Sequence, residues 1–81
     1  MPDDDSLKRG EALRRFGGSL AHLRARSGLT QESLAGLAGL HRTYVGSVER
    51  GERNPTLITI LKLADALGCA PADFFNEVGA Q

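Results

Sequence analysis

Residues 39–55, GLHRTYVGSVERGERNP, concentrate side chains that bind charged or polar partners, including three arginines on and after a short predicted helix. A guanidinium can donate two parallel hydrogen bonds to guanine O6 and N7, or bind a phosphate. Arg42 stands at the amino-terminal end of this helix, and Thr43 and Ser47 lie four residues apart on its outer face. Both hydroxyl side chains are short enough to let the helix approach a partner closely. These residues predict a surface that enters an acceptor-lined groove, the alternative being that Arg42 contacts phosphate only.

Further polar side chains around this helix are of the kind that contact a phosphate backbone. Some lie at or before the start of a helix, where free backbone N–H groups favour anions. Others follow the end of the 42–50 helix, where they would hold a phosphate strand. Tyr44 has two open interpretations, contact with a phosphate or base step, or packing alone. The expected backbone contacts are Gln31, His41, Tyr44, Arg50, Arg53 and Asn54.

The charges of the chain cancel overall but are distributed unevenly along it. Residues 14–53 hold seven basic and three acidic side chains, a balance of +4, and the rest of the chain has a balance of −4. Binding to nucleic acid requires a local positive face that displaces counterions, whatever the total charge. The uneven distribution therefore favours a nucleic-acid surface, against the alternative that scattered arginines only keep the domain in solution.

The elements that must position these side chains are helices, because apolar residues recur at spacings of three and four. Residues 10–81 predict one all-α domain of five short helices around a single core. Residues 1–9 are acidic and are expected to form a disordered tail. Gly28, Gly39 and Gly51 are expected to end helices, and Thr30 and Thr56 to begin them. The expected helices are 11–26, 31–38, 42–50, 56–68 and 71–78.

The core-facing positions follow from the same spacing. Each helix is expected to turn one apolar stripe inward, and the opposite side of the 42–50 helix is left to solvent. The expected inward residues are Leu13, Phe16, Leu20 and Leu23; Leu34, Leu37 and Ala38; Val45 and Val48; and Leu57, Ile60, Leu61, Ala64 and Leu67.

The helices at 31–50 have the spacing of a helix-turn-helix. Counted from Gln31, a small alanine falls at the fifth place, a glycine at the ninth, and valines at the fifteenth and eighteenth. Ala35 allows the two helices to cross closely, and Gly39 can adopt the positive φ of a tight turn. In a helix-turn-helix the second helix lies in the DNA major groove.

From about Phe16 to Phe75 the chain resembles the Cro/repressor-type (XRE-like) helix-turn-helix family. The segments LRARSGLTQESLAGLAGL and VERGERNPTLITILKLADALG follow the family pattern. HRTYVGSVERGERN is most similar to the controller proteins of bacterial restriction–modification systems. Two positions depart from the pattern: Gly46 removes a side chain from the expected outer face, and Ser33 replaces the longer residue of the usual capping box.

The resemblance implies a compact repressor-like DNA-binding domain that regulates transcription. The family's base-reading positions correspond to Arg42, Thr43 and Ser47. Its structural ion pair corresponds to Arg24 and Glu49. An activating member would also contact RNA polymerase, and no residue of the chain marks such a contact.

Two adjacent phenylalanines near the carboxyl terminus predict self-association. Phe74 and Phe75 cannot both point into one small core, so one is expected to face outward and form a dimer interface. A homodimer would place two recognition helices about 34 Å apart, and it would read a pseudo-palindrome in double-stranded DNA.

Other functions are less well matched by the sequence. It shows no nucleophile–base pair, metal-ligand set or phosphate-binding glycine loop, so we expect no enzyme activity, metal, cofactor or small-molecule substrate. It has no apolar run near 20 residues and a single cysteine, so we expect a cytoplasmic protein without membrane contact. The alternatives are a stand-alone or phage-type repressor, or an antitoxin or adaptor that uses the fold to bind protein. The latter would present an apolar face on residues 42–50, where this chain is polar.

Overall fold

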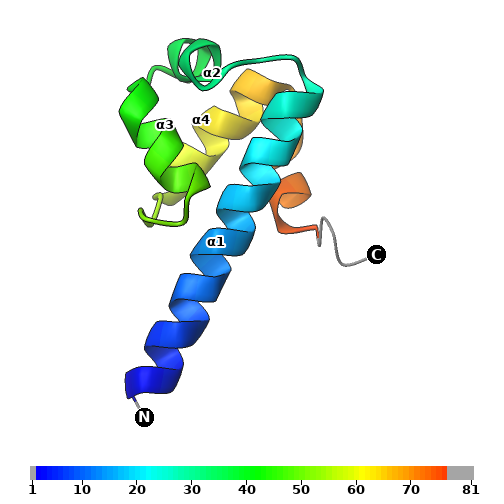
Figure 1. Cartoon of the computed structure of the whole chain (residues 1–81). Coiled ribbons are helices and arrows are strands. Elements are labelled where there is room, and N and C mark those ends of the chain that lie inside the picture. The colour runs from blue at the N-terminus through cyan, green and yellow to red at the C-terminus, as the bar shows by residue number, and fades with distance from the viewer. Residues whose placement is uncertain (1, 77–81) are drawn as a thin grey trace.

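A computed structural model of the chain describes the backbone of residues 2–76 and the side chains of residues 8–76. It contains four α-helices and one short 3-10 helix, and no strand is found in that range. The α-helices are α1 (Pro2–Arg26), α2 (Gln31–Ala38), α3 (Arg42–Glu49) and α4 (Leu57–Leu67), and the 3-10 helix is η1 (Pro71–Phe75). Figure 1 shows α1 extending below the body that the other elements form.

The first helix is longer than the sequence predicted. It begins at Pro2 and not near residue 11, so residues 2–9, expected to be a disordered tail, are its first turns. Proline is favoured at the first helical position, where its missing N–H is not needed. Acidic residues are also favoured at a helix amino terminus. The terminal composition that suggested disorder is therefore compatible with a helix start.

The turns on either side of α2 agree with the sequence prediction, with one correction. Gly28 and Gly39 have φ of 75° and 72°, the left-handed conformation that ends a helix. Thr30 caps α2, since its Oγ1 accepts from Ser33 N at 3.0 Å. The capping box, expected to be absent, is present: Ser33 Oγ accepts from Thr30 N at 2.8 Å. A serine hydroxyl is long enough to reach the cap backbone, so the longer residue is not required.

The fifth predicted helix is only a 3-10 turn. Ala70 N donates to Asp73 Oδ2 at 3.0 Å and Asp73 N donates to Ala70 O at 2.9 Å, which closes a tight turn. Asn76 has an extended ψ of 146°, so the helix ends at Phe75. The predicted continuation over residues 77–78 lies outside the described residues. Five residues with i to i+3 bonds fit the usual short length of a 3-10 helix.

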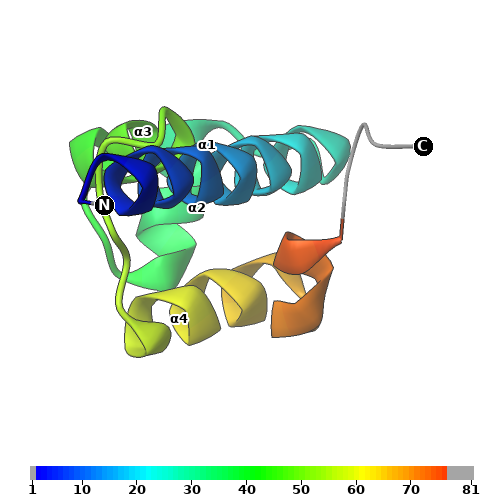
Figure 2. The ribbon, with the colours of Figure 1, turned by 90° about the horizontal axis from the view of Figure 1, so that it is seen from below.

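The core lies where α1, α2, α3, α4 and η1 meet. Figure 2 shows α1 and α3 side by side at one side of the body and α4 at the other. Every α-helix and η1 contributes buried side chains, and Phe16 and Phe74 pack with ring centroids 5.2 Å apart. The buried apolar residues are Phe16, Leu20, Leu34, Ala35, Ala38, Val45, Val48, Leu63, Ala64 and Phe74.

Three expected inward residues are exposed. Leu37, Leu57 and Leu61 have exposed fractions of 63%, 68% and 41%. Leu37 lies beside the Leu34–Ala35–Ala38 stripe with which α2 meets the core. On α4, Leu63 and Ala64 take the central core positions, which turns Leu57 and Leu61 to solvent. The apolar residues of α4 cover more of its circumference than one core-facing stripe requires, so spacing alone did not identify the buried side.

Over the described part of the chain, no helix has both the length and the hydropathy to cross a bilayer.

Candidate nucleic-acid interface

The helix α3 has one buried side and one polar side. Val45 and Val48 are 0% and 1% exposed and fasten α3 to the core, as the sequence predicted. Arg42 and Thr43, at the amino-terminal end of the helix, are exposed. Arg42 makes no hydrogen bond or ion pair with any described residue, so its five donors are available to a partner.

The other predicted contact residues on α3 are partly engaged within the chain. Ser47 is half-buried and its Oγ donates to Tyr44 O at 2.8 Å, so it is less accessible than Thr43. Tyr44 packs against the core, and the Arg53 guanidinium lies 5.4 Å from its ring centroid. Stacking on the ring restricts Arg53 beside the end of α3 while leaving it exposed. His41 precedes α3, and His41 and Asn54 are both exposed.

The carboxyl-terminal end of α3 is held directly against α1. A Cβ added at Gly17 would lie 2.5 Å from the carbonyl oxygen of Glu49 and closer still to that of Val48. Only glycine therefore permits this approach of the two backbones. Two residues after Glu49, Gly51 has φ of 77° and lies against Arg14 of α1, whose Cγ would be 2.7 Å from an added Cβ. Neither contact is evident from the spacing of residues in the sequence.

A partly buried hydrogen-bond network joins the same end of α3 to α1 and α2. Arg24 Nε and Nη2 donate to Glu49 at 2.6 Å and 3.1 Å, and the two side chains are 18% and 6% exposed. Arg24 Nη1 donates to Leu29 O at 2.8 Å. Gln31 Nε2 donates to Glu49 Oε1 at 2.8 Å. The hydrogen bond with Glu49 raises the pKa of Arg24, and the network orients α3 against both neighbours.

The network places Gln31 and Gly46 differently from the sequence interpretation. Gln31 was expected to offer its amide to a phosphate, and one of the two N–H groups of that amide donates to Glu49. Gly46 was expected on the outer face, but it is buried. A Cβ added there would lie 3.2 Å from Gln31 Oε1 and 3.3 Å from Arg50 Nη1. The glycine therefore makes room for these two side chains over α3.

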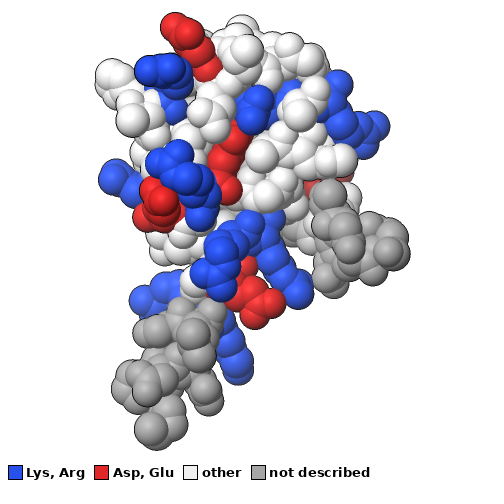
Figure 3. Space-filling view, in the orientation of Figure 1, with Lys and Arg blue, Asp and Glu red and all other residues white. Residues whose placement is uncertain are grey.

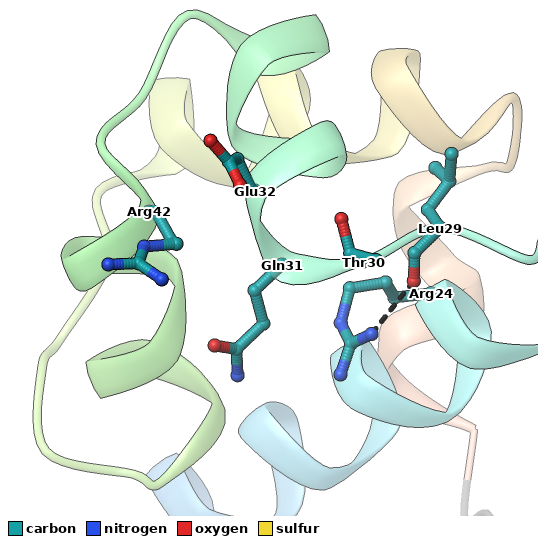
Figure 4. A pocket seen from close by; sticks show the side chains of 6 residues that line it. All are labelled: Arg24, Leu29, Thr30, Gln31, Glu32 and Arg42. Atoms are coloured by element: carbon teal, nitrogen blue, oxygen red, sulfur yellow. Dashed lines mark hydrogen bonds between the residues drawn. The ribbon is translucent and has the colours of Figure 1, made fainter.

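An open depression of about 380 Å³ separates the polar ends of the three helices. Figure 4 shows Gln31 and Glu32 entering it from α2, Arg42 from α3 and Arg24 from α1. The first N–H groups of α2 lack helical partners and form part of its positive wall. Arg24 is paired with Glu49 and Glu32 is a carboxylate, so Arg42 and these N–H groups are the parts of the lining that favour an anion. Its full lining is Arg24, Leu29, Thr30, Gln31, Glu32 and Arg42.

The arginines of this face differ in whether a carboxylate accompanies them. Figure 3 shows basic side chains spread over the face made by α1 and α3, with acidic side chains among them. Arg50 donates through Nε and Nη2 to Glu52 at 3.0 Å and 3.1 Å. This hydrogen bond raises the pKa of Arg50 and lowers the pKa of Glu52. Arg42 and Arg53 make no ion pair within the described residues, so an unneutralised arginine lies near each end of α3.

The comparison with protein families decides what this arrangement is. A helix-turn-helix family profile matches residues 20–74, which include α2, α3 and the depression between them. The chain belongs to the helix-turn-helix family. In this family α2 and α3 form the motif itself, as the spacing of Ala35, Gly39, Val45 and Val48 predicted.

Several relatives of this helix-turn-helix chain are control proteins. Control protein C.SmaI of Serratia marcescens is 63% identical over 51 residues, which are 63% of this chain and 61% of that protein. Control protein C.BamHI of Bacillus amyloliquefaciens is 42% identical over 67 residues, covering 79% and 83% of the two chains. The crystal structure of the restriction-modification controller protein C.AhdI from Aeromonas hydrophila superposes with a TM-score of 0.79 at 54% identity, covering 80% and 98%.

No three metal-ligating side chains come together within the described residues. The one cysteine, Cys69, is half-buried, and burial raises the pKa of its thiol.

Proposed function

We propose that this helix-turn-helix chain is a sequence-specific transcription regulator that binds pseudo-palindromic operator DNA as a homodimer. One observation carries the proposal: Arg42 and Thr43 are exposed at the amino-terminal end of α3, next to the start of α2. A recognition helix reads base edges with its amino-terminal residues while the preceding helix crosses the backbone. The polar side of α3 fits DNA better than the apolar side that a protein-binding adaptor would present.

Each part of the interface has a separate task in this proposal. Arg42 bonds a guanine through O6 and N7, and Thr43 contacts the neighbouring base edge. The first turn of α2 binds a phosphate through backbone N–H groups, and through the N–H of the Gln31 amide that is not bonded to Glu49. Arg53 binds a second phosphate beyond the end of α3. Ser47, with His41, Tyr44 and Asn54, has a supporting place at the edge of this contact.

The biological role we propose is that of a restriction–modification controller acting in the bacterial cytoplasm. The control proteins among the relatives support this role over a stand-alone or phage-type repressor. On an operator beside a promoter, the regulator would block RNA polymerase or contact it. A binding site upstream of a neighbouring endonuclease gene would support the controller role. A site beside unrelated genes would favour a stand-alone repressor.

The function is tested by selecting binding sites from random duplex DNA at one fixed salt concentration. We expect a consensus with two related half-sites about 10 base pairs apart centre to centre, one turn of DNA. A guanine is expected in each half-site at the position that Arg42→Ala no longer discriminates. Recovery of unrelated sequences after repeated rounds would overturn the proposal of sequence-specific binding.

The homodimer is supported by apolar side chains exposed on and after α4. Leu57, Ile58 and Leu61 are 68%, 59% and 41% exposed, and Phe75 is 63% exposed while Phe74 is buried. Of the two phenylalanines predicted at the interface, only Phe75 is therefore placed to contact a second copy. Four of the five large apolar side chains exposed in the described residues lie on α4 and η1, which favours an interface there over isolated exposures.

Sedimentation of single variants tests this interface. We expect wild type to be dimeric at micromolar concentration, and Ile58→Ser and Phe75→Ser to sediment as folded monomers. Leu37→Ser is the matched control, because it removes an equally exposed leucine from α2. Monomeric wild type up to high micromolar concentration would rule the dimer out. Loss of the dimer in Leu37→Ser alone would move the interface to α2.

A further inference from the structure

The ion pair between Arg50 and Glu52 lies in the part of the interface where a phosphate contact was predicted. Glu52 accepts from Nε and Nη2 of Arg50 at 3.0 Å and 3.1 Å, so it occupies one edge of the guanidinium. A phosphate would use the same two parallel hydrogen bonds. Both side chains are more than half exposed, at 58% and 57%, so a phosphate can reach the pair.

The backbone at the end of α3 holds the two residues in this geometry. Arg50 is the C-cap residue that follows α3, and its backbone N–H donates to Gly46 O at 3.1 Å. Gly51 turns the chain with φ of 77°, and Glu52 N then donates to Ser47 O at 2.9 Å. The backbone is therefore already fixed, and forming the ion pair requires only the two side chains to become ordered.

Two glycines make this arrangement possible. The left-handed turn at Gly51 brings Glu52 back beside Arg50, a conformation that residues with a Cβ rarely adopt. Gly46 leaves room for the Arg50 guanidinium over α3, since an added Cβ would lie 3.3 Å from its Nη1. The backbone of the turn therefore favours the ion pair between Arg50 and Glu52.

We propose that Glu52 is a specificity-determining residue that competes with DNA phosphate for Arg50. This inference rests on the proposed function, and it assigns a role in specificity to a residue that contacts no base. In operator complexes the base contacts fix the register, so a phosphate is aligned to displace the carboxylate from both donors. On random DNA the register is not fixed, and Glu52 keeps Arg50. The pair therefore lowers affinity for random DNA more than affinity for the operator.

The direct test compares wild type with Glu52→Gln on two duplexes, the operator selected above and a shuffled duplex of equal length and composition. We expect affinity for the shuffled duplex to rise several-fold while affinity for the operator rises less. The slope of log affinity against log salt should steepen by about 2 for the shuffled duplex, one added phosphate contact per protomer. The operator slope should stay the same, because Arg50 already binds phosphate there.

Two further variants separate competition from a general charge effect. Glu32→Gln removes an exposed negative charge beside the proposed phosphate contact of α2, so its effect on each duplex should be the same with Arg50 and with Arg50→Ala. In an Arg50→Ala background, Glu52→Gln should add nothing beyond that general effect, because the coupling requires both partners.

The outcomes distinguish the two proposals. If wild type does not prefer the selected operator, the proposed function fails. If wild type prefers it but Glu52→Gln raises both affinities by similar factors, or still acts without Arg50, the role of Glu52 is overturned.

Discussion

At its amino-terminal end α3 presents the side chains of Arg42 and Thr43 to solvent, with no partner among the described residues. At its carboxyl-terminal end it is held by backbone contact, a partly buried ion pair and a glycine turn. No side chain caps the first end, and His41 precedes it without a capping hydrogen bond. At the second end, Glu49 alone accepts from two different helices. A recognition helix must be fixed in orientation, and its side-chain hydrogen-bond donors must remain available to DNA. Separating these tasks between its two ends lets an eight-residue helix meet both requirements.

The strongest test of the anchored end exploits two neighbouring glycines of α1. Gly17→Ala should lower the free energy of unfolding by about 2–3 kcal/mol, because its Cβ meets the backbone of α3. Gly18→Ala should raise it by about 0.5–1 kcal/mol, because nothing lies within 4 Å of the added Cβ. Chemical denaturation of the two variants measures both effects. Equal responses at the two positions would mean that α1 does not touch the end of α3.

The second test removes the ion pair at the same end. Glu49→Ala leaves the half-buried Arg24 with only Leu29 O, and should destabilise the fold by about 2 kcal/mol. It should also weaken operator binding, since α3 loses contacts with α1 and α2 together. Thermal denaturation and titration with the operator measure the two effects. Asp65→Ala, which removes an exposed carboxylate from α4, is the control and should change neither. An unchanged Glu49→Ala variant would show that the anchoring does not depend on this pair.

The third test addresses the free end, where stability should not be affected. Arg42→Ala should leave the melting temperature unchanged and cost about 1–3 kcal/mol of discrimination at one base pair in each half-site. Binding to the operator would fall, and binding to shuffled DNA would change much less. Equal losses on both duplexes would show that Arg42 binds phosphate, so that Thr43 and the shape of the DNA carry the specificity.

The fourth and smallest effect is expected at Arg53, beyond the anchored end. Arg53→Ala should weaken binding to both duplexes by similar factors, because a phosphate contact carries no sequence information. A dimer would lose two such contacts, so the salt slope should become shallower by about 2. A selective loss of operator binding would instead place Arg53 at a base edge.

The sequence by itself determined the class of fold, the helix-turn-helix and the polar end of α3. These features depend on local spacing and turn chemistry, as at Thr30, Gly39, Val45 and Val48. Interactions between residues close in sequence can be inferred from the sequence alone. An outward-facing phenylalanine followed from simple geometry, since adjacent aromatic side chains cannot share one small core, and the structure shows that it is Phe75.

Only the tertiary structure decided which residues of each helix meet one another. By helix propensity alone Gly17 is only an unfavourable residue within α1, and the structure shows the backbone of α3 against it. Gly46 was expected on the outer face, and the structure places Gln31 and Arg50 over it. Leu57 and Leu61 looked buried because α4 is apolar around most of its circumference, and packing against α2 and η1 chose Leu63 and Ala64 instead. The partner of an arginine depends in the same way on how the chain turns, so Glu52 acquired its place beside Arg50 only through the left-handed turn at Gly51.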